Sequence, residues 1–254
     1  MIQVNLKYDH LFFDLDNTLW DFDANARPAL QQTVKELGQD GSPSDFDSFF
    51  AYYEQVNSRL WEAYRKQEIN KTEFTAQRFK ITLEHYGINN IDPTGMNNRY
   101  QEILPTYTQL VDGALETLGY LKSKGYHLHI ITNGFKEAQL KKMKNSGLAP
   151  YFEKIFISEE INASKPDKRI FRHALVCCNA KKRKSLMIGD SWDTDILGAK
   201  NFGIDQVYFQ KISKNNNTPL KDNIPNLITD DFIKHTPQKK TILVKKLTSL
   251  TNFL

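Results

Sequence analysis

The stretch Phe12-Phe13-Asp14-Leu15-Asp16-Asn17-Thr18-Leu19 contains the end of a short apolar run that begins at His10. We interpret His10–Asp14 as a buried strand, and open α/β sheets bind their ligands where such strands end. Asp14 and Asp16 stand two residues apart, so they leave the strand on roughly the same side. A buried carboxylate pair is unfavourable unless a cation neutralises it. The stretch therefore predicts a hard metal ion with oxygen ligands, most simply Mg²⁺.

Four further apolar runs have the length and composition of strands: His127–Thr132, Lys154–Ile157, Ser185–Gly189 and Gln206–Phe209. Candidate helices alternate with them at short spacing. They follow Asp112 as an N-cap, span Lys136–Asn145 and Lys168–Asn179, and start near Asp193. This alternation predicts an α/β fold, a Rossmann-like parallel sheet with helices on both faces. We expect the tail to add a polar loop at Asn215–Thr218, a strand near Asn226–Thr229 and a last helix over Thr241–Leu250.

The first strand is followed by a long stretch, from Phe22 to Tyr107, that has no strand-like run. Its apolar residues recur at helical spacing. The third of its four candidate helices has a capping-box start, with Glu73 three residues after Asn70. The sequence thus predicts a small helical bundle over residues 21–108, inserted into an α/β core formed by residues 1–20 and 109–254.

Composition and charge fit a globular protein of 254 residues, with 40% hydrophobic and 25% charged residues. The net charge of +4 is uneven, because eight Lys and three Asp after residue 210 give +5 there and −1 elsewhere. These Lys alternate with apolar residues, so we interpret them as a solvated helix face and expect no nucleic-acid partner. No run approaches the ~20 apolar residues of a membrane span. Adjacent Cys177 and Cys178 fit a cytoplasmic protein without disulfides.

Three later motifs also lie at expected strand ends. Thr132-Asn133-Gly134 offers a hydroxyl, an amide and a backbone N–H to phosphate oxygens, although such a triplet is also an ordinary turn. Lys165, in Ser164-Lys165-Pro166-Asp167, could offset the carboxylates and hold phosphate, or be a surface lysine. In Met187–Asp195, Asp190 could complete a metal site, Asp195 could hold Lys165 or a metal-bound water, and Asp193 is expected to be an N-cap.

These four motifs, in this order, resemble those of the haloacid dehalogenase (HAD) superfamily, from Phe12 to Gly203, and the helical insert resembles its cap domain. The resemblance implies a nucleophile, Asp14, and a general acid and base, Asp16. It implies that Lys165 orients nucleophile and phosphate. Asp190 would ligate Mg²⁺ together with Asp14 and the backbone carbonyl of Asp16. The resemblance also implies four substrate-binding residues, namely Thr18, Thr132, Asn133 and Gly134. Asp195 would support the site indirectly, through Lys165 or a metal-bound water.

Asp16-Asn17-Thr18-Leu19-Trp20-Asp21-Phe22 is most similar to the pyrimidine 5′-nucleotidase-type members. This resemblance implies a Mg²⁺-dependent phosphomonoester hydrolase with an aspartyl-phosphate intermediate, acting on a small phosphorylated metabolite as a monomer or dimer. The alternatives are a sugar-phosphate or phosphoglycolate-type phosphatase, a phosphomutase, and a binding protein without activity. Dehalogenases and phosphonatases of the superfamily lack the second carboxylate of this motif, so Asp16 argues against them.

Overall fold

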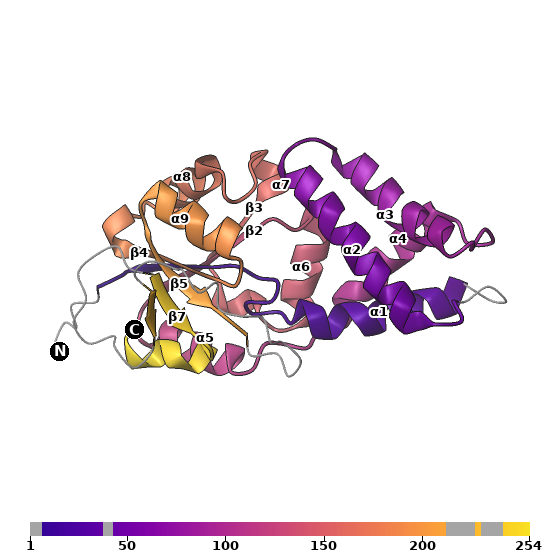
Figure 1. Ribbon diagram of the computed structural model, residues 1–254. Coiled ribbons are helices and arrows are strands. Elements are labelled where there is room, and N and C mark those ends of the chain that lie inside the picture. The colour runs from indigo at the N-terminus through magenta and orange to yellow at the C-terminus, as the bar shows by residue number, and fades with distance from the viewer. Residues whose placement is uncertain (1–6, 38–42, 212–226, 230–240) are drawn as a thin grey trace. The chain divides into compact units, whose positions relative to one another are not determined.

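The computed structural model describes residues 7–37, 43–211, 227–229 and 241–254 (Figure 1). Seven strands form one sheet in the order β3-β2-β1-β4-β5-β7-β6, and every neighbouring pair is parallel. Their bounds are β1 His10–Phe13, β2 His127–Thr132, β3 Lys154–Ile157, β4 Ser185–Gly189, β5 Asp205–Phe209, β6 Leu227–Thr229 and β7 Thr241–Val244. The predicted parallel α/β sheet is confirmed.

Strand β1 lies between β2 and β4, in the interior of the sheet. Its residues Leu11, Phe12 and Phe13 are fully buried, because a parallel strand is covered on both faces and therefore reads as an unbroken apolar run. Phe12 belongs to a core cluster that also contains Phe171 and Phe202. Because β1 is central, the residues that follow it lie near the middle of the row of strand ends.

Helices cover both faces of the sheet (Figure 1). Helices α8 (Lys168–Cys177) and α9 (Leu197–Phe202) pack on the face that carries Phe12. Helix α5 (Ala114–Ser123) and the 3₁₀ helix Leu247–Asn252 lie on the other. The remaining elements of this part are short: a 3₁₀ turn at Ala149–Tyr151, α7 at Ser158–Ile161, a 3₁₀ turn at Lys182–Lys184 and a π-helical turn at Trp192–Ile196.

Four helices follow β1 directly, as predicted: α1 Phe22–Leu37, α2 Phe46–Arg65, α3 Lys71–His85 and α4 Pro93–Ile103. The capping box of Asn70 and Glu73 is present at the start of α3. A 3₁₀ turn, Leu104–Thr106, ends the insert.

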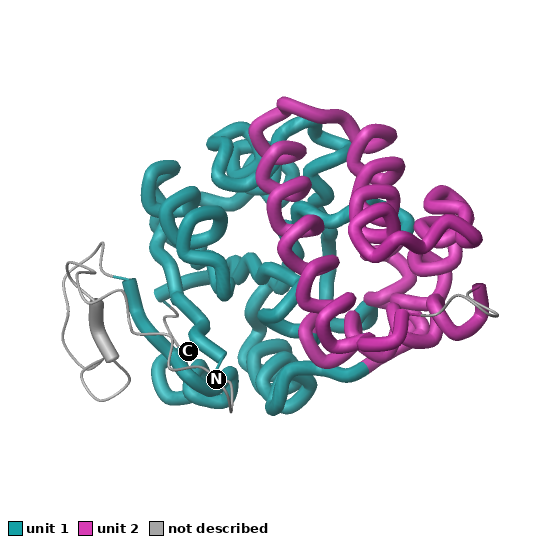
Figure 2. Tube along the Cα trace, turned by 45° about the vertical axis from the view of Figure 1, so that its right-hand side comes forward, with its two compact units in different colours: residues 1–21, 109–137, 146–254 teal, residues 22–108, 138–145 magenta. Residues whose placement is uncertain are grey.

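The chain forms two compact units (Figure 2). One comprises residues 1–21, 109–137 and 146–254, and the other residues 22–108 and 138–145. The second unit thus includes most of α6 (Lys136–Asn145). The assignment of 21–108 as a separate cap domain stays a prediction.

Three local predictions are wrong. Thr241–Leu250 is not one helix, because Thr241–Val244 forms β7 between β5 and β6, where an apolar, β-branched run fits the sheet, and only its end lies in the 3₁₀ helix Leu247–Asn252. Asp112 does not cap α5, whose N-cap is Gly113 in a left-handed conformation at φ +77°. Asp193 is not an N-cap either, since Ser191 accepts from the Thr194 N–H. In place of the helix face predicted for the basic tail, its described part holds β6, β7 and the 3₁₀ helix Leu247–Asn252, and Asn215–Thr218 lies outside the described residues.

None of the described helices combines the length and the apolarity that crossing a membrane requires. Cys177 and Cys178 are both free thiols, as the sequence predicted.

Candidate active site

The chain makes a tight turn immediately after β1. Asn17 adopts φ +58°, a left-handed conformation that Asn tolerates better than most side chains. The Asn17 N–H donates to the Trp20 carbonyl at 2.7 Å, and the Leu19 N–H to the Leu15 carbonyl at 2.9 Å. This turn places Thr18 against the loop that follows β4. The Thr18 hydroxyl donates to Asp190 Oδ1 at 2.8 Å and accepts from the Asp190 N–H at 3.0 Å.

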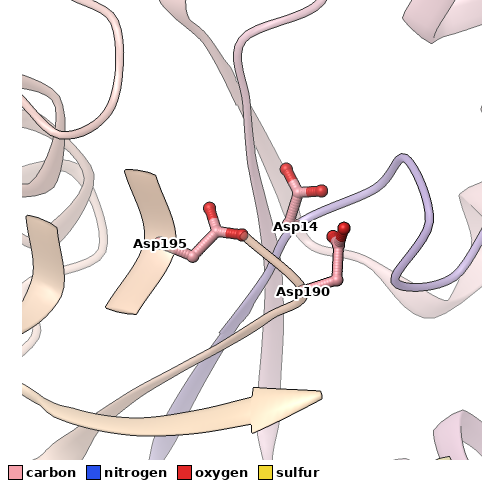
Figure 3. Close-up of side chains that lie close together, drawn as sticks. All are labelled: Asp14, Asp190 and Asp195. Carbon is pink, nitrogen blue, oxygen red and sulfur yellow. The ribbon is translucent and has the colours of Figure 1, made fainter. Parts of the chain in front are cut away.

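Three carboxylates gather at the carboxyl ends of β1 and β4 (Figure 3). Asp14 follows β1, whereas Asp190 and Asp195 come from the segment after β4. One oxygen of each lies within 4.8 Å of an oxygen of the other two. Asp14 is 8% exposed and Asp195 is fully buried. Such a group of oxygens suits a hard divalent cation.

Lys165 supplies a buried positive charge to this cluster. It is 2% exposed. Its ammonium group donates to Asp14 Oδ1, forms an ion pair with Asp195 Oδ1 at 2.7 Å, and donates to the Ile131 carbonyl at 2.8 Å. Burial alone would lower the pKa of Lys165, but the two carboxylates outweigh burial and hold the pKa above its usual range. Lys165 is therefore charged throughout the physiological pH range.

Asn133 holds the backbone of Lys165 from the end of β2. Its side-chain oxygen accepts from the Lys165 N–H at 2.8 Å, and its amide group donates to the Lys165 carbonyl at 3.0 Å. Both polar atoms of one side chain thus fix one residue 32 positions away. Asn133 was predicted to bind substrate, and the contact that the structure shows is instead with Lys165.

One lysine does not balance the negative charge of the cluster. The pKa of Asp14 rises to about 7, first because the side chain is buried, and Asp195 and Asp16 raise it further against the opposing effect of Lys165. Burial also raises the pKa of Asp190 well above its ordinary value, followed by repulsion from Asp14 and Asp195. These carboxylates are therefore costly as anions unless a further cation joins them, so the cluster fits a bound Mg²⁺.

Three more predicted site residues, Asp16, Thr132 and Gly134, lie at or just after the ends of β1 and β2. Asp16 is half-buried in the turn after β1. Thr132 ends β2, and its hydroxyl accepts from the Gly134 N–H at 3.2 Å. Lys165 is bonded to Asp14, Asn133 and Asp195, and Thr18 is bonded to Asp190, whose carboxylate lies within 4.8 Å of those of Asp14 and Asp195. The roles predicted for Asp16, Thr132 and Gly134 stay predictions.

Sequence reasoning named Thr18 and Asn133 as substrate-binding residues but missed the contacts by which they position other site residues. Thr18 contacts Asp190, and Asn133 contacts Lys165. Gly189 is a third example, because a Cβ atom at this position would lie 2.3 Å from Asp195 Oδ2. Only glycine lets the Asp195 carboxylate approach the strand this closely. The signal for Gly189 was its place at a strand end directly before the acidic loop.

Known proteins are similar to this one over most of its length. A family model described as haloacid dehalogenase-like hydrolase matches residues 8–203. Pyrimidine 5′-nucleotidase PynA of Streptococcus pneumoniae is 36% identical over 212 residues, which are 83% of this chain and 87% of PynA. Glyceraldehyde 3-phosphate phosphatase of Pyrococcus furiosus is 32% identical over 200 residues, 79% and 80% of the two chains.

A solved structure has the same fold over nearly its whole length. It is the HAD-hydrolase YfnB of Bacillus subtilis bound to magnesium, with a TM-score of 0.78 and 28% identity. The match covers 97% of this chain and 98% of the YfnB chain.

Proposed function

Because the chain belongs to the haloacid dehalogenase-like hydrolase family, we propose that it is a Mg²⁺-dependent phosphatase that cleaves pyrimidine nucleoside 5′-monophosphates through an aspartyl phosphate on Asp14. The observation that supports this proposal is the buried contact of Lys165 with both Asp14 and Asp195, directly beside Asp190. A cation that fixes one carboxylate within an acidic cluster suits attack on a phosphorus atom surrounded by negative oxygens.

Two displacements account for the reaction. An oxygen of Asp14 attacks phosphorus, and the bond from phosphorus to the ester oxygen breaks. Asp16, protonated, gives its proton to the departing alkoxide. Asp16 then takes a proton from water, whose oxygen attacks the phosphorus of the aspartyl phosphate. Inorganic phosphate leaves, and the Asp14 carboxylate is restored.

The other residues hold charge and position during both steps. Lys165 keeps one oxygen of Asp14 in place and offsets charge on the phosphoryl oxygens. Asp195 and Asn133 in turn fix the ammonium group and the backbone of Lys165. Asp14, Asp190 and the backbone carbonyl of Asp16 would hold Mg²⁺, which when bound neutralises the carboxylates and the phosphate. Thr132, Asn133, Gly134 and Thr18 remain candidates for substrate contacts.

The choice of a pyrimidine nucleotide rests on two observations: the residues 16–22 that follow the nucleophile, and the 36% identity with PynA. A second candidate, a sugar- or triose-phosphate phosphatase, is supported by the 32% identity with the Pyrococcus furiosus enzyme. Both candidates use the same site and differ only in the leaving alcohol.

Phosphate release from a panel of monoesters separates these candidates. The panel contains UMP, dUMP, dTMP, AMP, glyceraldehyde 3-phosphate, other sugar phosphates and phosphoglycolate, each with and without Mg²⁺. We expect Mg²⁺-dependent release with the highest kcat/KM for the pyrimidine nucleotides. A preference for a sugar or triose phosphate would keep the chemistry and overturn the nucleotidase assignment. A need for a bisphosphate activator would reveal a phosphomutase, and no release from any ester would leave a binding protein.

The covalent intermediate has its own test. p-Nitrophenyl phosphate has a leaving group that needs no proton, so Asp16→Asn should release about one nitrophenolate per chain in a burst and then turn over slowly. Asp14→Asn should give no burst, and its turnover should fall on the order of 10⁴-fold or more while the protein stays folded. A burst that survives Asp14→Asn would contradict the role of Asp14.

A further inference from the structure

Three histidines meet at the amino ends of β1 and β2, at the opposite end of β1 from Asp14. His10 begins β1, and His127 and His129 lie on β2. His10 is paired in register with His127, and Phe12 with His129. Side chains in register project to the same face of a parallel sheet, so all three imidazoles share one face. Three of the six histidines of the chain thus occupy one corner of the sheet.

Two ring nitrogens of this group face each other directly. His10 Nδ1 and His129 Nε2 are 3.1 Å apart, and the two rings are nearly parallel with centroids 5.4 Å apart. With metal–nitrogen bonds of about 2.05 Å, nitrogens at this separation would subtend an angle of roughly 100° at a shared ion. That angle is close to tetrahedral. The same two nitrogens now share a hydrogen bond, so each ring would turn by about 40° to direct its nitrogen at a shared ion.

His127 provides a third imidazole beside this pair. Its ring stacks on that of His10 with centroids 4.9 Å apart, and its side chain is 51% exposed. His127 Nδ1 contacts Glu153 Oε1 at 2.8 Å. A carboxylate on one ring nitrogen is the arrangement that orients a histidine to bind metal through the other nitrogen. The exposed ring of His127 can turn about its Cβ–Cγ bond, and it opens the corner to solvent.

Burial favours the neutral form of two of these imidazoles, those of His129 and His10. Burial lowers the pKa of His129 to about 4, with a further contribution from His10. The pKa of His10 is also lowered, again mainly by burial. His129 Nδ1 is buried and has no hydrogen-bond partner among the described residues. Nearby charges are those of Asp9, Glu153 and Lys154, and the Lys154 ammonium group donates to the Cys177 carbonyl.

We propose that this corner of the sheet is a binding site for one divalent transition-metal ion of the Zn²⁺ class, with His10 Nδ1 and His129 Nε2 as its first two ligands and His127 as its third. Imidazole nitrogens select such ions, whereas the carboxylates of Asp14, Asp190 and Asp195 suit Mg²⁺. One short strand, β1, would then lead from a nitrogen site at its start to an oxygen site at its end.

The test is a Zn²⁺ titration of the full chain without an affinity tag, read by competition with a chromophoric chelator. Saturating Mg²⁺ is present throughout to occupy the carboxylate cluster. We expect one Zn²⁺ per chain. His10→Gln and His129→Phe should each weaken binding about 100-fold or more, because loss of a ligand exceeds the 10- to 100-fold effect of losing an outer-shell partner. Glu153→Gln should weaken it by about tenfold.

His85→Gln is the matched control, since His85 stacks on Tyr52 in the helical insert and should leave Zn²⁺ affinity unchanged. Circular dichroism and Mg²⁺-dependent phosphate release show whether each variant is folded. His127→Gln repeats the test at an exposed position, outside the core. Unchanged Zn²⁺ affinity in folded His10→Gln and His127→Gln would overturn the proposal. So would Zn²⁺ binding that disappears only in Asp190→Asn.

Discussion

The sheet unit buries Lys165 and the helical insert buries Arg78, and these two cations have opposite surroundings. Lys165, 2% exposed in the sheet unit, contacts the carboxylates of Asp14 and Asp195. Arg78, 3% exposed in the helical insert, has no carboxylate within ion-pair distance among the residues that the structure describes. Its Nε donates to Asn97 Oδ1 at 2.9 Å, and its guanidinium carbon lies 5.1–5.3 Å from the ring centroids of Phe74, Phe79 and Tyr100.

The difference separates a charge used for chemistry from a charge used for packing. Asp14, which contacts Lys165, is unfavourable as an anion because it is buried, and its pKa is raised to about 7. Shifted carboxylates beside a fixed cation are typical of catalytic sites. The partners of Arg78 are ring faces and one amide, none of which exchanges a proton in this range. Burial of a charged residue therefore does not by itself indicate function, whereas the titration of its partners does.

Lys165→Met should have the largest effect that this comparison predicts. Removing the cation leaves Asp14 without its anchor and the phosphoryl oxygens without an opposing charge, so kcat/KM should fall about 10³-fold. Arg78→Met, the matched change in the helical insert, should keep kcat/KM within about threefold, because it touches no titrating partner. Steady-state phosphate release measures both. An equal fall in kcat/KM in the two variants would contradict the different roles assigned to Lys165 and Arg78.

The pH dependence of Mg²⁺ binding should be the next largest effect. Below about pH 7, protons compete with the metal for Asp14, whose pKa is raised to about 7, and for Asp190, whose pKa is also raised. The half-saturating Mg²⁺ concentration should therefore rise about tenfold per pH unit for each displaced proton as pH falls below 7. Thermal shift against Mg²⁺ concentration at several pH values measures it. A half-saturating concentration that does not change between pH 5 and 7 would contradict the raised pKa values.

The same shifts predict the stability of the metal-free protein. The folded chain holds protons on Asp14 and Asp190 at pH values where the unfolded chain, with a carboxyl pKa of 3.8, has released them. Because the folded state then binds more protons, the free energy of unfolding falls as pH rises from about 4 to 7. Mg²⁺ should cancel this slope. Arg78→Met should leave the slope unchanged, since no titrating group accompanies Arg78.

Asn133→Ala tests how far the sheet unit depends on the placement of Lys165. The change removes two hydrogen bonds of about 1 kcal/mol each to the Lys165 backbone, so we expect kcat to fall about tenfold while KM changes little. Asn97→Ala is the matched control, because it removes the amide partner of Arg78. It should cost similar stability in urea unfolding and leave kcat unchanged. A rise in KM with unchanged kcat in Asn133→Ala would indicate the substrate contact predicted from sequence.

Sequence patterns predicted the first five strands to within one residue. Their apolar runs are interrupted by polar or glycine residues at both ends, so the local signal is strong. Strand β7 was missed because its stability comes from pairing with β5, more than thirty residues earlier in the chain. The residues Thr241–Val244 alone carry no period that separates a strand from a helix.

The site residues could be identified by their type and place at strand ends, but their contacts could not. Thr18 meets Asp190 across 172 positions, and Asn133 meets Lys165 across 32. These contacts depend on how neighbouring strands bring their ends together, which no local pattern contains. The contacts of Arg78 with aromatic rings could not be predicted for the same reason, because those rings come from two helices, α3 and α4.

Arg78→Lys against Arg78→Met gives the smallest expected effect and tests the packing role of the second cation. Lysine keeps the charge but concentrates it in a strongly hydrated ammonium group that cannot spread over three rings. Methionine loses the charge and keeps a flexible apolar chain that fills the space. The free energy of unfolding in urea should therefore be about 1–2 kcal/mol lower for Arg78→Lys than for Arg78→Met. Phosphate release should be unchanged in both variants. Equal stability of Arg78→Lys and the parent chain would show that any cation suffices at this position. Arg78 and Lys165 would then differ only in whether their partners titrate.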